Sequence, residues 1–193
     1  MADFAARVSQ GHIGRAKYIA TNEHVRSNRK EILKSVTQLN NVADAFKAAQ
    51  RLVDIATEDA KAAAEIRDEK EQEELAQAYG KGATGRGMAS GGSKALKELE
   101  KEQKTRTTRM VRDSLDAALL DIATLYRDIM MVQSGNIDAL INLEMAQEIN
   151  AIANVVPTHK TIQRLDAVMK ARKALGFNAA PLLTIEALMC ELV

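Results

Sequence analysis

Helix-breaking residues are concentrated in one short segment of this chain. Six of the ten glycines lie between residues 80 and 92, and the chain contains only two prolines, Pro157 and Pro181. Glycine and proline most disfavour a helix interior, so their scarcity elsewhere permits long helices. Aromatic residues make up only 3% of the chain and tryptophan is absent, which argues against a β-sheet core. We therefore expect an all-α fold.

Two long helices are expected, one on each side of the glycine-rich segment. The first covers about residues 42–79 and the second about residues 93–133, and residues 80–92 are expected to form a flexible loop between them. Residues 58–74 hold eight acidic and three basic side chains, whereas residues 94–112 hold seven basic and three acidic ones. Antiparallel pairing would place these opposite charges side by side. The pattern therefore predicts a long antiparallel helical hairpin.

Apolar residues spaced four and three apart indicate the faces along which these helices pack. In the first long helix they are Val42, Phe46, Ala49, Val53 and Ala56. In the second they are Leu115, Leu119, Ile122, Tyr126 and Ile129. Both sets are expected to be buried.

Shorter helices are expected before and after this pair. They lie within residues 4–22, over 23–39, and over 143–154, 158–176 and 181–193, with Asn142 as the cap of the helix that follows it. In the helix over residues 158–176, the residues expected to face inward are Ile162, Leu165, Met169 and Leu175. The whole is a helical bundle of about five to six helices with a long antiparallel hairpin.

No set of residues with the spacing of a catalytic or metal site is found. The three histidines, His12, His24 and His159, are scattered, and no Glu-x-x-His motif occurs. An acidic group could gather a cation, but Arg67 and Lys70 lie among its members, so a solvated, salt-bridged face is the better interpretation. That group comprises Glu65, Asp68, Glu69 and Glu73. We expect no enzyme activity, no cofactor, no metal and no small-molecule substrate.

The remaining sequence features favour a cytoplasmic protein. The single cysteine, Cys190, cannot form an internal disulfide and is interpreted as a small core thiol. No apolar run approaches the roughly 18 residues that a membrane span needs. The glycine-rich segment lacks the Gly-Lys-Ser/Thr ending of a phosphate-binding loop. We expect no membrane partner.

The basic segment is the one candidate for contact with nucleic acid or a protein partner. Its residues are Lys94, Lys97, Lys101, Arg106, Arg109 and Arg112. They could follow a phosphate backbone. Against this, no aromatic residue lies among them for base stacking, and the acidic helix is available to neutralise them.

Several motifs resemble the C-terminal part of clamp-loader AAA+ subunits. Residues 11–16 (GHIGRA) resemble the helix start that closes the small lid domain, and residues 119–128 (LLDIATLYRD) resemble a helix of the C-terminal collar domain. Residues 178–188 (NAAPLLTIEAL) are similar to the start of the collar's last helix, and residues 164–167 (RLDA) and 171–175 (ARKAL) to the helix before it. Their order is similar to that of the delta-prime family of bacterial DNA polymerase III clamp-loader subunits. Residues 94–101 (KALKELEK) are similar to its high-GC Gram-positive branch.

The resemblance implies a division of the chain and a role for it. Residues 1–22 would be the remnant of an AAA+ lid domain, and residues 23–193 the helical collar domain. The role would be a non-catalytic oligomerisation module in the loader that places the sliding clamp on primed DNA during replication. Its partners would be the other loader subunits, with DNA contacted indirectly through the assembled loader.

The resemblance also bears on nucleotide binding. In ATPase members of the family an arginine follows the lid glycine and senses nucleotide. Here that position is Gly14, and Arg15 comes one residue late. This fits a subunit that does not hydrolyse ATP, within a parent chain that belongs to the DNA polymerase III holoenzyme.

One alternative remains open from the sequence. The chain could be a free-standing helical adaptor that binds nucleic acid through the basic helix over residues 94–112. Affinity that falls steeply with salt would distinguish this adaptor from a collar module.

Overall fold

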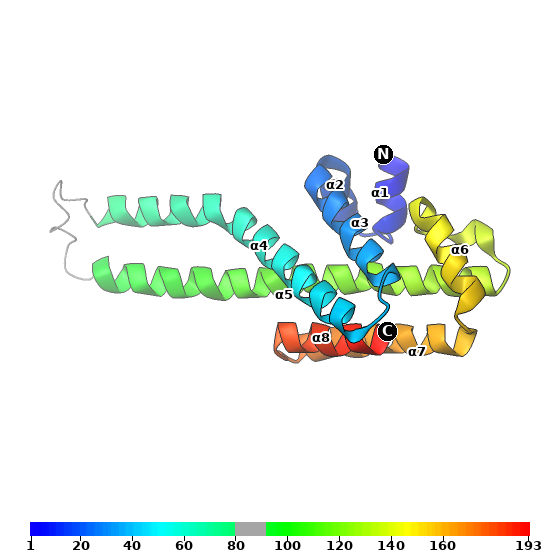
Figure 1. The fold of residues 1–193 in the computed structure, drawn as a ribbon. Coiled ribbons are helices and arrows are strands. Elements are labelled where there is room, and N and C mark those ends of the chain that lie inside the picture. Colours follow the sequence, from blue (N-terminus) through cyan, green and yellow to red (C-terminus); the bar gives the residue numbers. More distant parts are fainter. Residues whose placement is uncertain (80–91) are drawn as a thin grey trace. The chain divides into compact units, whose positions relative to one another are not determined.

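The computed structural model describes residues 1–79 and 92–193, and over these residues the fold is all-α (Figure 1). The expected loop over residues 80–92 therefore lies outside the described residues, apart from Gly92, which begins a helix. The α-helices are α1 (Ala2–Val8), α2 (Ile13–Thr21), α3 (Glu23–Thr37), α4 (Val42–Ala78), α5 (Gly92–Gln133), α6 (Ala146–Val155), α7 (Thr158–Gly176) and α8 (Pro181–Leu192). Two short 3₁₀ helices, η1 (Ile137–Ala139) and η2 (Leu143–Met145), precede α6.

The described residues hold eight α-helices, more than the five to six expected. The N-terminal segment supplies two of these helices, α1 and α2. Gln10 and Gly11 both have positive φ angles, of 52° and 85°, and this left-handed turn separates α1 from α2. The side chain of His12 then accepts the Arg15 N–H at the start of α2.

Local signals fix the other boundaries close to where the sequence indicates them. Asn22 caps α3 by accepting the N–H groups of His24 and Val25. Pro181 occupies the first turn of α8, where its missing N–H costs nothing. Gly135, with φ of +79°, ends α5 in a left-handed turn.

Two compact units make up the described chain. Unit 1 comprises Met1–Val53 and Leu115–Val193, and unit 2 comprises Asp54–Ser114. Helices α4 and α5 each contribute residues to both units.

The second half of α5 forms the centre of the unit 1 core. The five α5 residues expected to be buried are all at most 3% exposed: Leu115, Leu119, Ile122, Tyr126 and Ile129. On α8, which packs against α7, Ile185, Met189 and Leu192 are also buried. The packing face of α5 confirms the sequence prediction.

Unit 2 is the antiparallel hairpin that the charge pattern predicts. Residues 68–72 of α4 contact residues 103–106 of α5 through side-chain hydrogen bonds, which requires the two helices to run in opposite directions (Figure 1). Ala60 and Ala64 are buried in this unit. Among the helices of both described segments, none is long and apolar enough to cross a bilayer.

Candidate functional site

Arg106, a candidate contact residue, is committed to an ion-pair cluster inside unit 2. Its guanidinium lies 2.7 Å from a carboxylate oxygen of Glu71 and also pairs with Asp68. The charge-assisted hydrogen bond from Arg106 is the main reason that the pKa of Glu71 falls from 4.5 to about 2. The same two carboxylates raise the pKa of Arg106. Arg106 is therefore part of the hairpin contact and is not free to meet a phosphate.

Gln103 completes this cluster and was not anticipated from the sequence. It is only 5% exposed. Its side-chain amide accepts a hydrogen bond from Gln72 at 3.0 Å and donates to the main-chain carbonyl of Asp68 at 3.1 Å. A polar residue on the inner face of a charged helix has no distinctive sequence signal, so only the pairing register reveals its role.

The other candidate residues of the basic segment do not join Arg106. Lys94, Lys97, Lys101 and Arg109 are exposed, and Arg112 is partly buried. Within residues 54–79 and 92–114, none of these five forms an ion pair with an acidic side chain. The expectation that the acidic helix neutralises the basic one is thus met at Arg106 and not along the rest of the segment. The six candidates do not form one site.

Of the acidic group on α4, Asp68 takes part in the hairpin contact, beside Glu71, which is not a member of that group. Asp68 is held by Arg106, and Glu71 is held by both Arg106 and Arg67. No set of three potential ligands able to hold an ion occurs in the part of the chain that the structure describes.

A buried polar network lies in unit 1, centred on Arg29 of α3. This arginine is 6% exposed. It donates to Asp121 at 3.0 Å and to Glu144 at 2.9 Å, and it also donates to the side-chain oxygen of Asn142. Three acceptors on α5 and on the segment before α6 thus satisfy one buried cation, as burial of a charge requires.

Asp128 anchors the other side of this network. Fully buried, it accepts the main-chain N–H groups of Ile141 and Asn142 and the side-chain amide of Asn142. The prediction that Asn142 caps a helix through its side chain is wrong, because that side chain bonds to Asp128, Thr124 and Arg29 instead. The segment that leads into α6 is held by Asp128.

Arg15 joins two motifs of the resemblance, residues 11–16 and residues 119–128. Its guanidinium lies 2.6 Å from a carboxylate oxygen of Asp121, which also pairs with Arg29. The ion pair of Arg15 with Asp121 fixes α2 to α5, so Arg15 has a structural role. The sequence offers no signal for Arg29 itself, since an arginine in a polar helix is ordinarily exposed.

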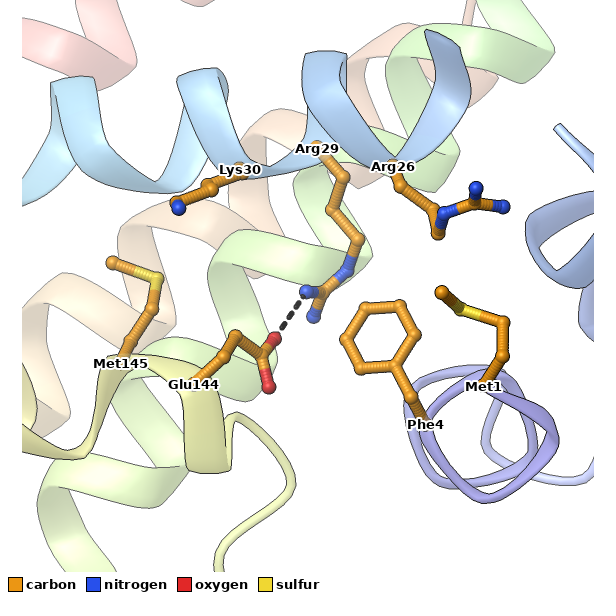
Figure 2. Close-up of a pocket in the computed structure, with 7 residues that line it drawn as sticks. All are labelled: Met1, Phe4, Arg26, Arg29, Lys30, Glu144 and Met145. Carbon is orange, nitrogen blue, oxygen red and sulfur yellow. Dashed lines mark hydrogen bonds and ion pairs between the residues drawn. The ribbon is translucent and has the colours of Figure 1, made fainter. Parts of the chain in front are cut away.

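A pocket of about 290 Å³ opens beside this network, between α1, α3 and η2 (Figure 2). Its lining residues are Met1, Phe4, Arg26, Arg29, Lys30, Glu144 and Met145. Figure 2 shows Arg29 directed between Phe4 and Glu144, with its guanidinium carbon 5.7 Å from the Phe4 ring centre. The charged lining residues of the pocket are three cations, Arg26, Arg29 and Lys30, and one carboxylate, Glu144. It can hold an apolar side chain.

An apolar stripe on α7 faces away from the core of unit 1. Ile162 and Met169, which were expected to face inward, are 43% and 47% exposed. That prediction is wrong for these two residues, because the inner face of α7 is formed by Thr161, Ala167, Val168, Ala171 and Leu175 instead. Ile162, Leu165 and Met169, spaced three and four apart, form what we call the α7 stripe.

The beginning of α4 departs from the prediction in the same way. Val42 and Phe46 are 54% and 47% exposed, while Ala45 and Leu52 are buried beside Ala49, whose burial confirms the prediction. The small alanines allow close helix packing and leave the larger side chains outside. Unit 1 therefore has more exposed apolar surface than the sequence predicts.

Comparison with known proteins gives no relative. No family model, curated protein or solved structure matches the chain.

Proposed function

We propose that the chain is a non-catalytic assembly module, the collar part of a delta-prime-type clamp-loader subunit, which helps to join the subunits that place the sliding clamp on primed DNA. The observation that carries this proposal is the α7 stripe. Helix α7 has apolar residues on its buried face and a second apolar stripe, in which Ile162 and Met169 are exposed and Leu165 is half-buried. A helix that is apolar on two faces is typical of one that packs against two neighbours.

The buried network supports the same proposal. Residues 11–16 and residues 119–128 are two motifs of the resemblance, and in unit 1 they are linked by the Arg15–Asp121 ion pair. Their polar residues are used to fix helices to one another. A rigid scaffold that presents an apolar surface is what an oligomerisation module needs.

We also propose partners and a cellular location for the module. The partners are the other subunits of the loader, DNA is contacted through the assembled loader, and the location is the cytoplasm. The division into a lid remnant over residues 1–22 and a collar over residues 23–193 remains part of this proposal.

The test is association with the other clamp-loader subunits encoded by the same genome. A tagged chain should co-purify with their C-terminal domains and should show no ATP turnover by itself. Failure to retain any of them, under conditions where those domains associate among themselves, would contradict the proposal.

A further inference from the structure

Four lysines on α5 form a basic stripe that the hairpin leaves unused. Lys94, Lys97, Lys101 and Lys104 are all exposed, and none forms an ion pair with another described residue of unit 2. At 3.6 residues per turn they fall within an arc of about 80° around the helix axis. We call these four residues the lysine stripe.

The position of the stripe follows from the side of α5 that contacts α4. Gln103 and Arg106, which bond to α4, lie on the opposite side of the helix from the four lysines. The acidic residues that pair with Arg106 are therefore directed away from the stripe. The arc of the stripe is basic although the chain as a whole has a net charge of only +1, and Glu98 and Glu100 lie on its two flanks.

The composition of the arc distinguishes between possible partners. Between residues 94 and 112 the arc contains the four lysines, Thr108 and Arg112, and it includes no acidic and no apolar side chain. Protein interfaces usually depend on a buried aromatic or aliphatic anchor, which this arc lacks. Contact with a phosphate backbone needs no such anchor, because it depends on the release of counterions by lysine and arginine.

The same residues favour duplex over single-stranded nucleic acid. Single-strand binding relies on aromatic side chains on which bases stack, and no aromatic residue lies in the arc. Lysine meets phosphates as a point charge, and the arc holds no Asn or Gln for a bidentate contact with adenine. Contact is then limited to the backbone.

We infer that the lysine stripe of unit 2 binds the phosphate backbone of duplex DNA without sequence preference. The four lysines span about 15 Å of helix length, at 1.5 Å per residue. Duplex DNA carries one charge per roughly 1.7 Å of its axis, so each lysine has phosphates within reach. This inference does not depend on the collar assembly proposed above.

The test measures binding of a fluorescent 20-base-pair duplex to the full chain by anisotropy, over a range of salt concentrations. Four phosphate contacts predict that log K falls with log salt with a slope of about −3 to −4. The variant K94Q/K97Q/K101Q/K104Q should bind at least tenfold more weakly, with a slope near zero. Glutamine preserves helix propensity, and circular dichroism should confirm unchanged helicity.

A charge-matched control separates the stripe from net charge. The variant K17Q/K47Q/K160Q/K170Q removes four exposed lysines of unit 1 and should bind within twofold of the unaltered chain. Equal weakening in both variants, or no duplex binding at 50 mM salt, would overturn the inference. Displacement of the duplex by polyglutamate, at equal charge and equal concentration, would also overturn the inference. The stripe would then be assigned to binding an acidic protein segment. Association with loader subunits should be unchanged in the lysine-stripe variant, so that either proposal can fail alone.

Discussion

At the scale of single residues, the charge of Arg29 is the most consequential buried feature of unit 1. It is satisfied by Asp121, Glu144 and Asn142 together. Removal of one partner from a buried ion pair leaves the other charge uncompensated, which costs about 3–5 kcal/mol. An exposed pair contributes less than about 1 kcal/mol, because water screens both charges.

The variant R29M tests this difference. It should lower the free energy of unfolding, measured by urea denaturation, by about 3–5 kcal/mol. Its matched control is K70M, which removes the exposed ion pair of Lys70 with Glu74 and should cost less than about 1 kcal/mol. Similar losses in the two variants would show that the Arg29 network does not behave as a buried one.

Tyr126 predicts a response to alkaline pH. Burial raises its pKa to about 12 in the folded chain, whereas an unfolded tyrosine has a pKa of about 10. Above pH 10 the unfolded state therefore releases the phenol proton before the folded state does, so stability falls as the pH rises through this range. The unaltered chain should lose more stability between pH 9 and pH 11 than Y126F does, as measured by urea denaturation at each pH. Equal losses would exclude this role for Tyr126.

At the scale of helices, the contact between α4 and α5 in unit 2 should weaken in acid. The pKa of Glu71 is held at about 2 by Arg106, below the ordinary value of 4.5. Its stabilising effect is therefore complete above about pH 4.5 and is lost as the pH falls from there towards 2.

The variant E71Q tests this contact. The unaltered chain should have a higher thermal midpoint than E71Q at pH 7, followed by circular dichroism, and the difference should disappear near pH 2. The neighbouring exposed Glu73 supplies the control, since E73Q removes the same charge without touching the Arg106 cluster. A difference between E71Q and the unaltered chain that persists at pH 2 would contradict the assignment.

The α7 stripe makes a separate prediction about association. The variant I162E/M169E places charges on the outer face of α7, where folding does not require apolar residues, so the monomer should keep its helicity. Its affinity for loader partners should fall at least tenfold, because interfaces depend on a few central apolar side chains. The control I137E/V155E alters two other exposed apolar residues, which lie outside α7. Equal affinity for the stripe variant and the unaltered chain in a pull-down titration would remove α7 from the interface.

At the scale of the whole molecule, the sequence predicts the helices and their boundaries better than it predicts which face of each helix is buried. The regular spacing of Leu115, Leu119 and Ile122 indicates the buried side of α5, because that helix has one strongly apolar stripe. In α7 both sides carry apolar residues, and Ile162 and Met169 are larger than Ala167 and Ala171 of the inner face. Periodicity alone assigns the larger residues to the core, and only tertiary packing corrects this.

The polar contacts were the least predictable part of the candidate site. Asp128 reaches across to residues 141 and 142, and Arg29 pairs with residues 92 to 115 positions away along the chain. Such pairing depends on the arrangement of helices within unit 1, which local sequence rules do not contain. The hairpin was predictable because its charges and its glycine-rich boundary are local features.

The central claim is that this chain works as an assembly module, and sedimentation velocity tests it most directly. The chain alone has a mass of 21.1 kDa. Mixed with the C-terminal domains of the other clamp-loader subunits, it should sediment as part of a larger hetero-oligomer of defined mass. Sedimentation at the rate of the chain alone in every mixture, while those domains assemble without it, would contradict the account.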